Sequence, residues 1–323
     1  MLECNENPPA GGKTLKDLLA DFLEHNRALN YSERTNQDYT RRIGHFLKWM
    51  ETHHQITAAD QLTRQHLDTW LRSLNSHRTP RGLPLKIKTV RLRVAVTRSF
   101  MNYLARMAYV HADLPEVLVA PKDEQLLPTS VLNHAQVKKL LSRVNTHNTI
   151  GYRDRAILEL LYSSGIRAAE LLGLDVGDVD LQSGTAKVTG KGRKQRVVPI
   201  GKTALKFLET YLVAIRPFMT KDDPNEQAMF INYQGERLRY GGLRRLVNVH
   251  SVPLGFDVPV SAHTFRRSCT TELIRGGANM YHVKELLGHE SLDMLKPYTK
   301  LTIQDLKKTH EKCHPREQQT DQP

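Results

Sequence analysis

Ser261-Ala-His-Thr-Phe-Arg-Arg-Ser-Cys-Thr-Thr-Glu-Leu-Ile274 is the stretch on which the prediction of the fold depends. Ser261 is a suitable N-cap, so the segment is expected to begin a helix. His263 and Arg266 lie three residues apart and therefore share one face of that helix. An imidazole beside a planar guanidinium can hold a phosphate. A solvated histidine with two arginines would look the same in isolation, so the neighbouring segments must decide.

The charge of the whole chain favours a polyanionic partner. Its 323 residues include 47 Lys and Arg against 34 Asp and Glu, which gives a formal net charge of +13. Such an excess points to nucleic acid before an anionic membrane. No apolar run approaches the roughly 20 residues of a membrane-spanning helix, and the first residues lack the apolar core of a signal peptide. We expect no membrane partner and a cytoplasmic location.

The cysteines and histidines show no pattern of a cofactor site. Cys4, Cys269 and Cys313 are far apart and form no CxxC pair, which is typical of a reduced, intracellular protein. The 15 histidines are scattered and include no HExxH spacing,. We therefore predict no metal and no other cofactor.

Residues 13–112 are expected to form a helical bundle. Apolar residues recur with the helical period in stretches that begin near Thr14, Ser32, Thr63 and Lys88, and the first two of these residues are suitable N-caps,. No alternating pattern typical of strands competes. The result is predicted to be a compact bundle of about four or five helices.

One part of this bundle is strongly basic. Between residues 78 and 98 the chain has several cations and no Asp or Glu. Such a run often covers only a solvated face, but the complete absence of acids favours contact with DNA phosphates. The predicted DNA-binding residues here are Arg78, Arg81, Lys86, Lys88, Arg91, Arg93 and Arg98.

Prolines at 115, 121 and 128 interrupt the periodicity and predict a linker over residues 113–130,. A second domain is expected at 131–315, followed by a polar, disordered tail at 316–323. In this domain we predict helices over 132–144, 152–162, 203–216, 240–250 and 280–287. A short strand is expected at 229–231, and a hairpin with strands at 184–190 and 195–200. The fold class is therefore mainly α with a small β-sheet.

Two further basic features have simple alternatives. Arg167 follows Gly165, and pairing with Glu170 would explain it. Lys191, Arg193 and Lys194 occupy the predicted hairpin tip, where cations are normally solvated. The same cations would suit a finger that reaches into a phosphate-lined groove and binds DNA, and a lysine there can act as a general acid.

Four blocks in this order give the chain its resemblance to a known family: Ser164-Gly-Ile-Arg-Ala-Ala-Glu-Leu171, Gly190-Lys-Gly-Arg-Lys194, His263-Thr-Phe-Arg266, and Leu286-Leu-Gly-His289 with Tyr298 nine residues on. The chain resembles the tyrosine recombinases (phage integrases), most closely the Xer-type or simple transposon and phage branch. By this resemblance the N-terminal bundle is a core-binding, SAM-like domain. The implied catalytic residues are Arg167, Lys191, His263, Arg266, His289 and the nucleophile Tyr298.

The resemblance implies a site-specific DNA recombinase. Such an enzyme cuts and rejoins double-stranded DNA through a covalent 3′-phosphotyrosyl intermediate and a Holliday junction, in DNA integration, excision or resolution. It implies a tetramer on DNA, of identical subunits or with a paralogous recombinase, and a nucleoid-associated protein. Arg267 stands where many members have His. Pro297 directly precedes Tyr298, which predicts a mobile nucleophile in DNA-free protein.

Three other functions stay open at this point. A type IB topoisomerase-like enzyme would use the same nucleophile to relax DNA. A catalytically silent DNA-binding protein would keep the fold without the chemistry. A metal-dependent nuclease is the third alternative.

Overall fold

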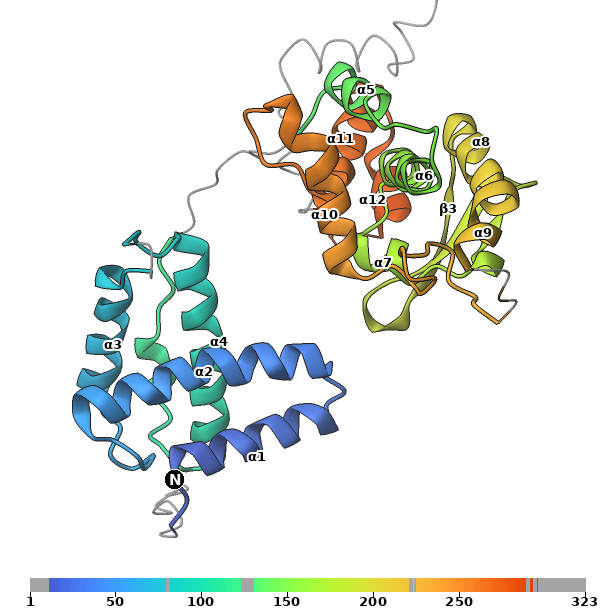
Figure 1. Cartoon of the computed structure of the whole chain (residues 1–323). Helices are drawn as coiled ribbons and strands as arrows, with labels where there is room; N and C mark the ends of the chain where they lie inside the picture. The colour runs from blue at the N-terminus through green and yellow to red at the C-terminus, as the bar shows by residue number, and fades with distance from the viewer. Residues whose placement is uncertain are drawn as a thin grey trace, which may run out of the picture. The chain divides into compact units, whose positions relative to one another are not determined.

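The computed structural model describes residues 12–79, 82–122, 131–220, 223, 225–288, 291–292 and 295. The chain forms two compact units, Met1–Gln125 and Leu126–Pro323 (Figure 1). Each unit has its own buried apolar core. In the described residues, no helix is long and apolar enough to cross a membrane.

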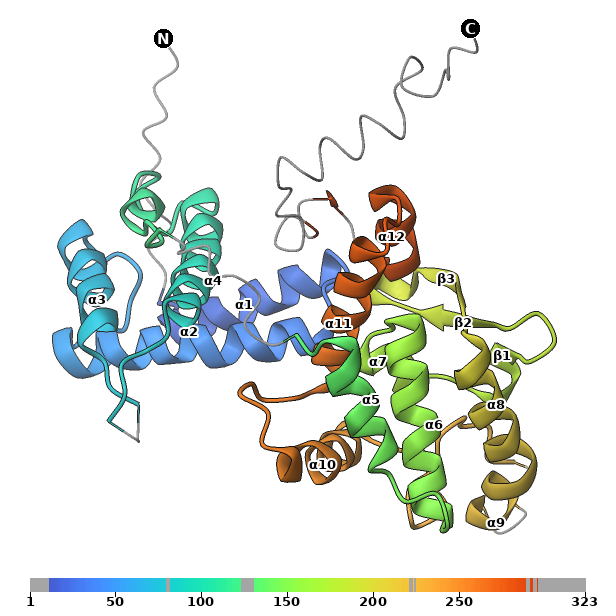
Figure 2. The same cartoon turned by 90° about the horizontal axis from the view of Figure 1, so that it is seen from above.

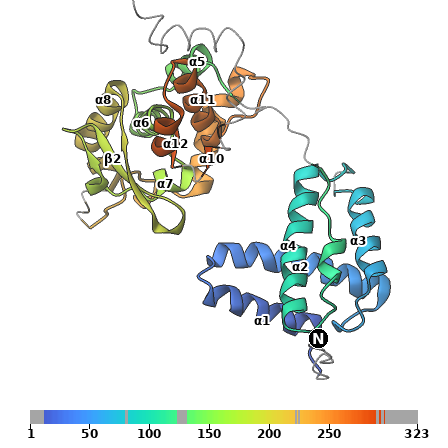
Figure 3. The same cartoon turned by 180° about the vertical axis from the view of Figure 1, so that it is seen from behind.

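The N-terminal unit is a helical bundle, as its periodicity predicts. It consists of α1 (Leu15–Ala28), α2 (Glu33–His54), α3 (Arg64–Ser76), α4 (Ile87–Arg106) and a 3₁₀ turn at Leu114–Val117. Thr14, Ser32 and Thr63 each cap the helix that follows through the side-chain oxygen. In Figure 3, α2 crosses behind α4 and lies beside α1.

The core of this unit continues past residue 112, where the sequence suggested its end. Leu114 and Leu118 are buried among the same apolar side chains as Phe46 and Phe100. The chain therefore leaves the bundle only after the 3₁₀ turn, and the described residues continue to Lys122.

The C-terminal unit is mainly helical. Its helices are α5 (His134–Ser142), α6 (Thr149–Ser164), α7 (Ala168–Leu172), α8 (Lys202–Thr210), α9 (Arg216–Thr220), α10 (Tyr240–Ser251), α11 (Ala262–Arg275) and α12 (Met280–Leu287). Short 3₁₀ turns lie at Val176–Asp178, Lys191–Arg193 and Val252–Leu254, and a π-helical turn at Tyr211–Ile215. Figure 2 shows α6 between α5, α8 and α11.

Helix α6 is the centre of this unit because its apolar residues face every side. Ile157, Leu158, Leu160 and Leu161 are completely buried, a pattern expected of an enclosed helix rather than an amphipathic one. Helices α8 and α11 both pack on it. The end of α6 is thereby fixed relative to the start of α11, which brings two of the predicted site segments together.

The sheet has three antiparallel strands in the order β1 (Val179–Asp180), β2 (Thr185–Thr189) and β3 (Gln195–Pro199). In the predicted hairpin, Ala186 pairs with Val198 and Thr189 with Gln195. Ala186, Val188 and Val198 point into the core, whereas the tip carries the cations. The expected mainly helical fold with a small sheet is confirmed.

One local prediction was wrong, and one predicted helix is longer than expected. Residues 229–231 form no regular strand, because only isolated bridges flank them, from Ala228 to Asp175 and from Ile231 to Arg237. The Met229 amide donates to the carbonyl of Leu174, and the Ile231 amide and carbonyl bind the side chains of Tyr211 and Arg153, which belong to helical segments. The helix expected over 203–216 does not end there, since α8 continues through the π-helical turn into α9 and reaches Thr220.

Candidate active site

The turn after α6 places Arg167 at the start of α7. Gly165 ends α6 with φ 62°, in the left-handed region that favours glycine,. A Cβ on Gly165 would lie 2.8 Å from Leu287 Cδ2 and 3.2 Å from Cys269 Sγ. The turn therefore packs directly on α11 and α12, which no bulkier residue would allow.

Arg167 is held by a buried carboxylate and a backbone carbonyl. Its Nη1 donates to Glu170 Oε1 at 2.8 Å, and its Nη2 donates to the carbonyl of Gly288 at 2.7 Å. Glu170 also accepts from the Arg167 amide at 2.7 Å. The pairing of Arg167 with Glu170 suggested by the sequence is thus present, and it fixes a guanidinium whose side chain is still 36% exposed.

Glu170 has a second arginine partner, Arg196 of β3. Arg196 Nη1 and Nη2 donate to the two carboxylate oxygens at 2.7 and 2.9 Å. Burial by itself raises the pKa of Glu170, but the hydrogen bonds from Arg196 and Arg167 outweigh it and bring the pKa to about 2. The carboxylate is therefore ionised throughout the physiological range.

Arg266 lies on the second turn of α11, where only 4% of its surface is exposed. Its Nη1 donates to the carbonyl of Gly165 at 2.8 Å and its Nη2 to that of Leu287 at 2.7 Å. Ser261 caps the helix as predicted, by accepting from the Thr264 amide. Arg266 thus joins the end of α6 to the end of α12.

Three arginines from three segments bind consecutive carbonyls at the end of α12. Arg196 Nε donates to Leu286 O at 3.0 Å, Arg266 to Leu287 O and Arg167 to Gly288 O. The carboxyl end of a helix carries partial negative charge, which cations stabilise. The two arginines expected to hold a phosphate, Arg167 and Arg266, therefore meet at adjacent residues.

His263 lies in the first turn of α11, and its side chain is exposed. The protein around it still desolvates the ring in part, and this effect, with the positive charges of Arg267, Arg266 and Arg167, lowers the pKa below its usual value of 6.5. The imidazole is then neutral at pH 7 and able to accept a proton. His263 thus belongs to the same electropositive group as the two arginines.

The hairpin tip is an exposed turn. Gly190 N donates to Lys194 O at 2.8 Å and closes it, and Gly192 and Arg193 have φ values of 72° and 58°. Arg193 and Lys194 are exposed. Lys191 stands in this tip by its backbone, one residue after Gly190, whose Cβ would lie 3.2 Å from Glu170 Oε1.

Several predicted features lie outside the described residues. They are His289, the nucleophile Tyr298 with the mobility expected of it, Arg81 and the polar tail. Helix α12 ends at Leu287, so His289 follows it by two residues in the chain.

The predicted cations of the N-terminal unit gather on α4 and just before it. Arg78, Lys86, Lys88 and Arg98 are exposed, and Arg91 and Arg93 are half-buried. Burial and the neighbouring charge of Arg42 on α2 lower the pKa of Arg93. Arg91 donates to the carbonyl of Pro121. No acidic side chain pairs with any of the six in the described structure.

The family of the chain can be decided from these blocks and two sequence matches. Residues 130–305 match the model of the phage integrase family, and residues 19–107 match that of the phage integrase N-terminal SAM-like domain. The first match alone covers more than half of the chain and contains every predicted catalytic residue.

The chain belongs to the phage integrase family of tyrosine recombinases. The tyrosine recombinase XerD of Listeria innocua serovar 6a is 34% identical over 306 residues, which cover 94% of this chain and 100% of that protein. The tyrosine recombinase XerC of Pelotomaculum thermopropionicum is 34% identical over 298 residues, 89% of this chain and 94% of the relative. The predicted family and the predicted function, site-specific recombination by DNA breakage and rejoining, are confirmed.

Solved structures show the same fold at low identity. The Tn1549 transposon integrase in complex with a circular intermediate DNA has a TM-score of 0.69 at 15% identity, covering 93% of this chain and 99% of that one. A lambda integrase dimer bound to a COC′ core site has a TM-score of 0.67 at 15% identity, covering 90% and 100%.

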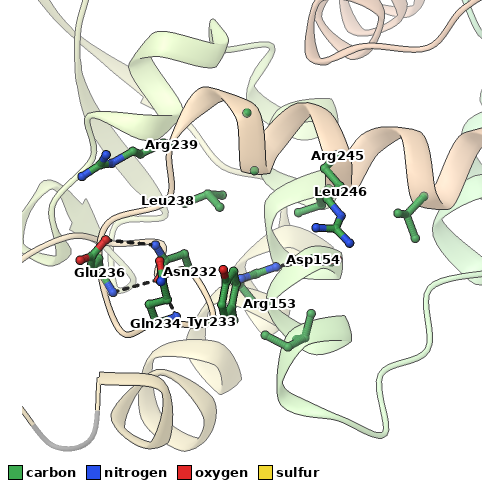
Figure 4. Close-up of a pocket in the computed structure, with 14 residues that line it drawn as sticks. Arg153, Asp154, Asn232, Tyr233, Gln234, Glu236, Leu238, Arg239, Arg245 and Leu246 are labelled. Atoms are coloured by element: carbon green, nitrogen blue, oxygen red, sulfur yellow. Dashed lines mark hydrogen bonds and ion pairs between the residues drawn. The ribbon is translucent and has the colours of Figure 1, made fainter.

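A separate pocket of about 710 Å³ lies elsewhere on the C-terminal unit of the recombinase. Figure 4 shows its lining, which comes from α6, the turn at 232–236 and α10. The buried Arg153 pairs with Asp154 at 2.6 Å there, and His250 Nε2 lies 3.0 Å from the other Asp154 oxygen. Arg167, His263 and Arg266 do not line it, so it is not part of the site described above.

No group of three or more His, Cys, Asp and Glu among the described residues is arranged to hold a metal ion. The recombinase does contain two site residues that the sequence did not single out for function. From the sequence, Glu170 is only an ordinary ion-pair partner for Arg167, and Arg196 is only part of a predicted strand. The sequence gives no local signal for either, because Ala169 beside Glu170 and both neighbours of Arg196, Gln195 and Val197, are exposed.

Proposed function

We propose that the recombinase exchanges DNA strands through Tyr298. In this mechanism Tyr298 Oη attacks a scissile phosphate in line, the phosphorus–O5′ bond breaks, and a 3′-phosphotyrosyl bond forms with a free 5′-hydroxyl. A 5′-hydroxyl from the partner duplex then attacks this bond and releases the tyrosine. The number of phosphodiester bonds is conserved, so the exchange requires no ATP.

The observation that carries the proposal is the meeting of Arg167 and Arg266 at adjacent carbonyls of α12. Guanidiniums fixed in this way are preorganised for the charge that develops on the non-bridging oxygens in the transition state. His289, two residues beyond α12, is proposed to donate another hydrogen bond to the same phosphate. These donors supply the electrostatic stabilisation that Mg²⁺ provides in other phosphoryl-transfer enzymes.

His263 and Lys191 are proposed to move the protons. The lowered pKa of His263 keeps the imidazole neutral at pH 7, so it can accept the proton of the Tyr298 hydroxyl. Lys191, on the hairpin tip, is proposed to protonate the leaving 5′-oxygen. The base then comes from α11 and the acid from the hairpin tip. In-line attack places the entering and leaving oxygens on opposite sides of the phosphorus, so the two proton-transfer groups must lie apart.

The partner is proposed to be double-stranded DNA, bound by both units. The cations of α4 and of the hairpin tip contact phosphates, and the net charge of +13 adds long-range attraction,. We also propose a tetramer, of identical subunits or with a paralogous recombinase, because exchange between two duplexes requires four cleavages. Its place of action would be the nucleoid in the cytoplasm.

The experiment compares wild-type protein with Tyr298→Phe. Duplexes that the variant binds are first selected from a random pool, and they are then nicked next to the cleavage position so that a covalent complex cannot reverse. Wild type is expected to give a protein–DNA adduct on denaturing gels, and the variant none, with a duplex Kd within about threefold of wild type. Equal adduct yields would remove Tyr298 as the nucleophile.

The same assay separates the alternatives. A type IB topoisomerase-like enzyme would form the adduct but no Holliday junction between two duplexes, whereas a silent DNA-binding protein would form neither. A metal-dependent nuclease would lose activity in EDTA and leave no covalent adduct.

A further inference from the structure

We propose that Arg196 is a positioning residue of the recombinase, which holds the Arg167 side chain, the Lys191 hairpin and the end of α12 in one fixed arrangement. This inference rests on the proposed function, because it assigns a role to Arg196 in the cleavage that Arg167, Lys191 and Tyr298 perform. Arg196 itself is not proposed to touch DNA.

Each of the three guanidinium nitrogens of Arg196 donates a hydrogen bond inside the protein. Its two terminal nitrogens bind both oxygens of Glu170, and Nε binds the carbonyl of Leu286. Only 16% of the side chain is exposed, and that of Glu170 is 1% exposed. This fork geometry is available to arginine and not to lysine, so the position is built for one residue type.

The contact with Glu170 determines where Arg167 points. Glu170 Oε1 accepts from Arg196 Nη1 and from Arg167 Nη1, so the two guanidiniums share one oxygen. A carboxylate held from one side by Arg196 leaves only the other side for Arg167. Removal of Arg196 would free Glu170 to turn, and Arg167 would move with it.

The same carboxylate lies beside the start of the turn that carries Lys191. A Cβ on Gly190 would lie 3.2 Å from Glu170 Oε1 and 3.8 Å from Arg196 Nη1. Arg196 lies on β3, five residues after Lys191, and pairs across the hairpin with Val188 of β2. The backbone that carries Lys191 is therefore packed against the Glu170–Arg196 pair.

The third contact reaches the segment that leads to His289. Gly288 ends α12 with φ 62°, and a Cβ there would lie 3.0 to 3.1 Å from the Arg196 guanidinium. The guanidinium thus lies flat against the backbone of the last turn of α12. It connects this turn to β3, whereas Arg266 connects it to α6.

A pH profile distinguishes positioning from a general loss of structure. The carboxylate of Glu170 takes its described hydrogen bonds from Arg167 and Arg196 and is buried. In Arg196→Met one of these cations is lost while burial remains, so the carboxyl protonates at a higher pH. Protonated Glu170 holds Arg167 less well, and cleavage by the variant should weaken further as the pH falls.

The experiment measures single-turnover adduct formation on saturating nicked duplex between pH 5.5 and 7.5. Arg196→Met is expected to be slower than wild type by about 10- to 100-fold at pH 7.5, the loss typical of a misplaced catalytic group, and the ratio should grow as the pH falls. Arg196→Lys should lie between the two. In Glu170→Gln/Arg196→Met the ratio to wild type should no longer vary with pH, because no carboxyl remains.

Lys187→Met is the matched control. It removes one cation from the neighbouring strand β2, where Lys187 is exposed and pairs with Asp178, and it should cleave within about twofold of wild type. An Arg196→Met rate within twofold of wild type, or an equal loss in Lys187→Met, would overturn the proposal. If Arg196→Met does not fold, a rate and pH profile of Arg196→Lys identical to wild type would have the same consequence.

Hydrogen–deuterium exchange of the DNA-free proteins tests the arrangement without any reaction. Amides at residues 285–288 should exchange faster in Arg196→Met than in wild type. Their exchange rates in Lys187→Met should equal those of wild type. Unaltered exchange in Arg196→Met would contradict the proposal even if wild type formed no adduct. Absence of adduct from wild type with altered exchange would instead count against the proposed chemistry alone.

Discussion

At the scale of single residues, two glycines with positive φ allow a close test of packing at the site. Gly277 follows α11 with φ 82° and would have nothing within 4 Å of an added Cβ, whereas Gly288 ends α12 with φ 62° against the Arg196 guanidinium. Alanine at either position strains the backbone by about 1 kcal/mol. Only at Gly288 does it also displace a side chain of the site.

Gly277→Ala is therefore expected to lower stability by about 1 kcal/mol and to cleave DNA at the wild-type rate. Gly288→Ala should lower stability more and slow adduct formation by about tenfold, because a 3.0 Å contact must be relieved by moving Arg196 or α12,. Thermal unfolding and single-turnover cleavage of both variants measure this. Equal cleavage by the two variants would show that the contact has no role in the chemistry.

Single residues of the site also differ in how far their positions could be predicted from the sequence. His263 and Arg266 could be assigned to one helix face because Ser261 caps that helix and spacing within a helix is local. Arg196 could not, since its strand alternates like any half-exposed strand and its partner Glu170 is distant in sequence. The pairing depends on the packing of α7 against β2, a long-range contact with no local signature.

At the scale of elements, five helices were predictable from their caps as well as from their apolar periodicity, and the connections were not. Thr14, Ser32, Thr63, Asn133 and Ser261 each accept the hydrogen bond that starts a helix. Residues 229–231 are apolar and buried like a strand, but among the described residues only isolated bridges form beside and within them. A short apolar run specifies burial, and pairing depends on the rest of the fold.

The β2–β3 hairpin is the element whose role can be tested by chemistry alone. If Lys191 protonates the leaving 5′-oxygen, Lys191→Ala should slow cleavage of normal DNA by about 100-fold or more. A 5′-bridging phosphorothiolate, whose sulfur leaves without a proton, should restore most of the rate. Quantified adduct from the two substrates gives the comparison.

Lys194→Ala is the control on the same tip, because Lys194 is exposed and is proposed only to contact phosphate. Its defect should appear in DNA affinity and be the same for both substrates. Failure of the phosphorothiolate to rescue Lys191→Ala selectively would exclude the general-acid role.

At the scale of the whole molecule, the cations differ in whether an acidic side chain pairs with them. Many cations of the N-terminal unit are paired with acids, as Lys16 is with Glu51 and Arg72 with Asp68. The exposed Lys88 and Arg98 of α4 have no acidic partner among the described ion pairs. Positions ten residues apart are separated by about 80° around a helix, so both side chains lie on the exposed side of α4. Net charge attracts DNA, but this face is where phosphates would bind.

Neutralising this face should therefore change the salt dependence of binding, and neutralising paired cations should not. Each phosphate contact contributes about 0.9 to the slope of log K against log salt, so Lys88→Gln/Arg98→Gln should lower the slope for duplex DNA by nearly 2. Lys16→Gln/Arg72→Gln removes the same charge from the same unit and should leave the slope almost unchanged, because each of these cations already has an acid beside it. Titrations by fluorescence anisotropy between 50 and about 250 mM salt resolve this difference. Equal slopes for the two double variants would mean that the unit attracts DNA through its total charge, with no defined phosphate-binding face on α4.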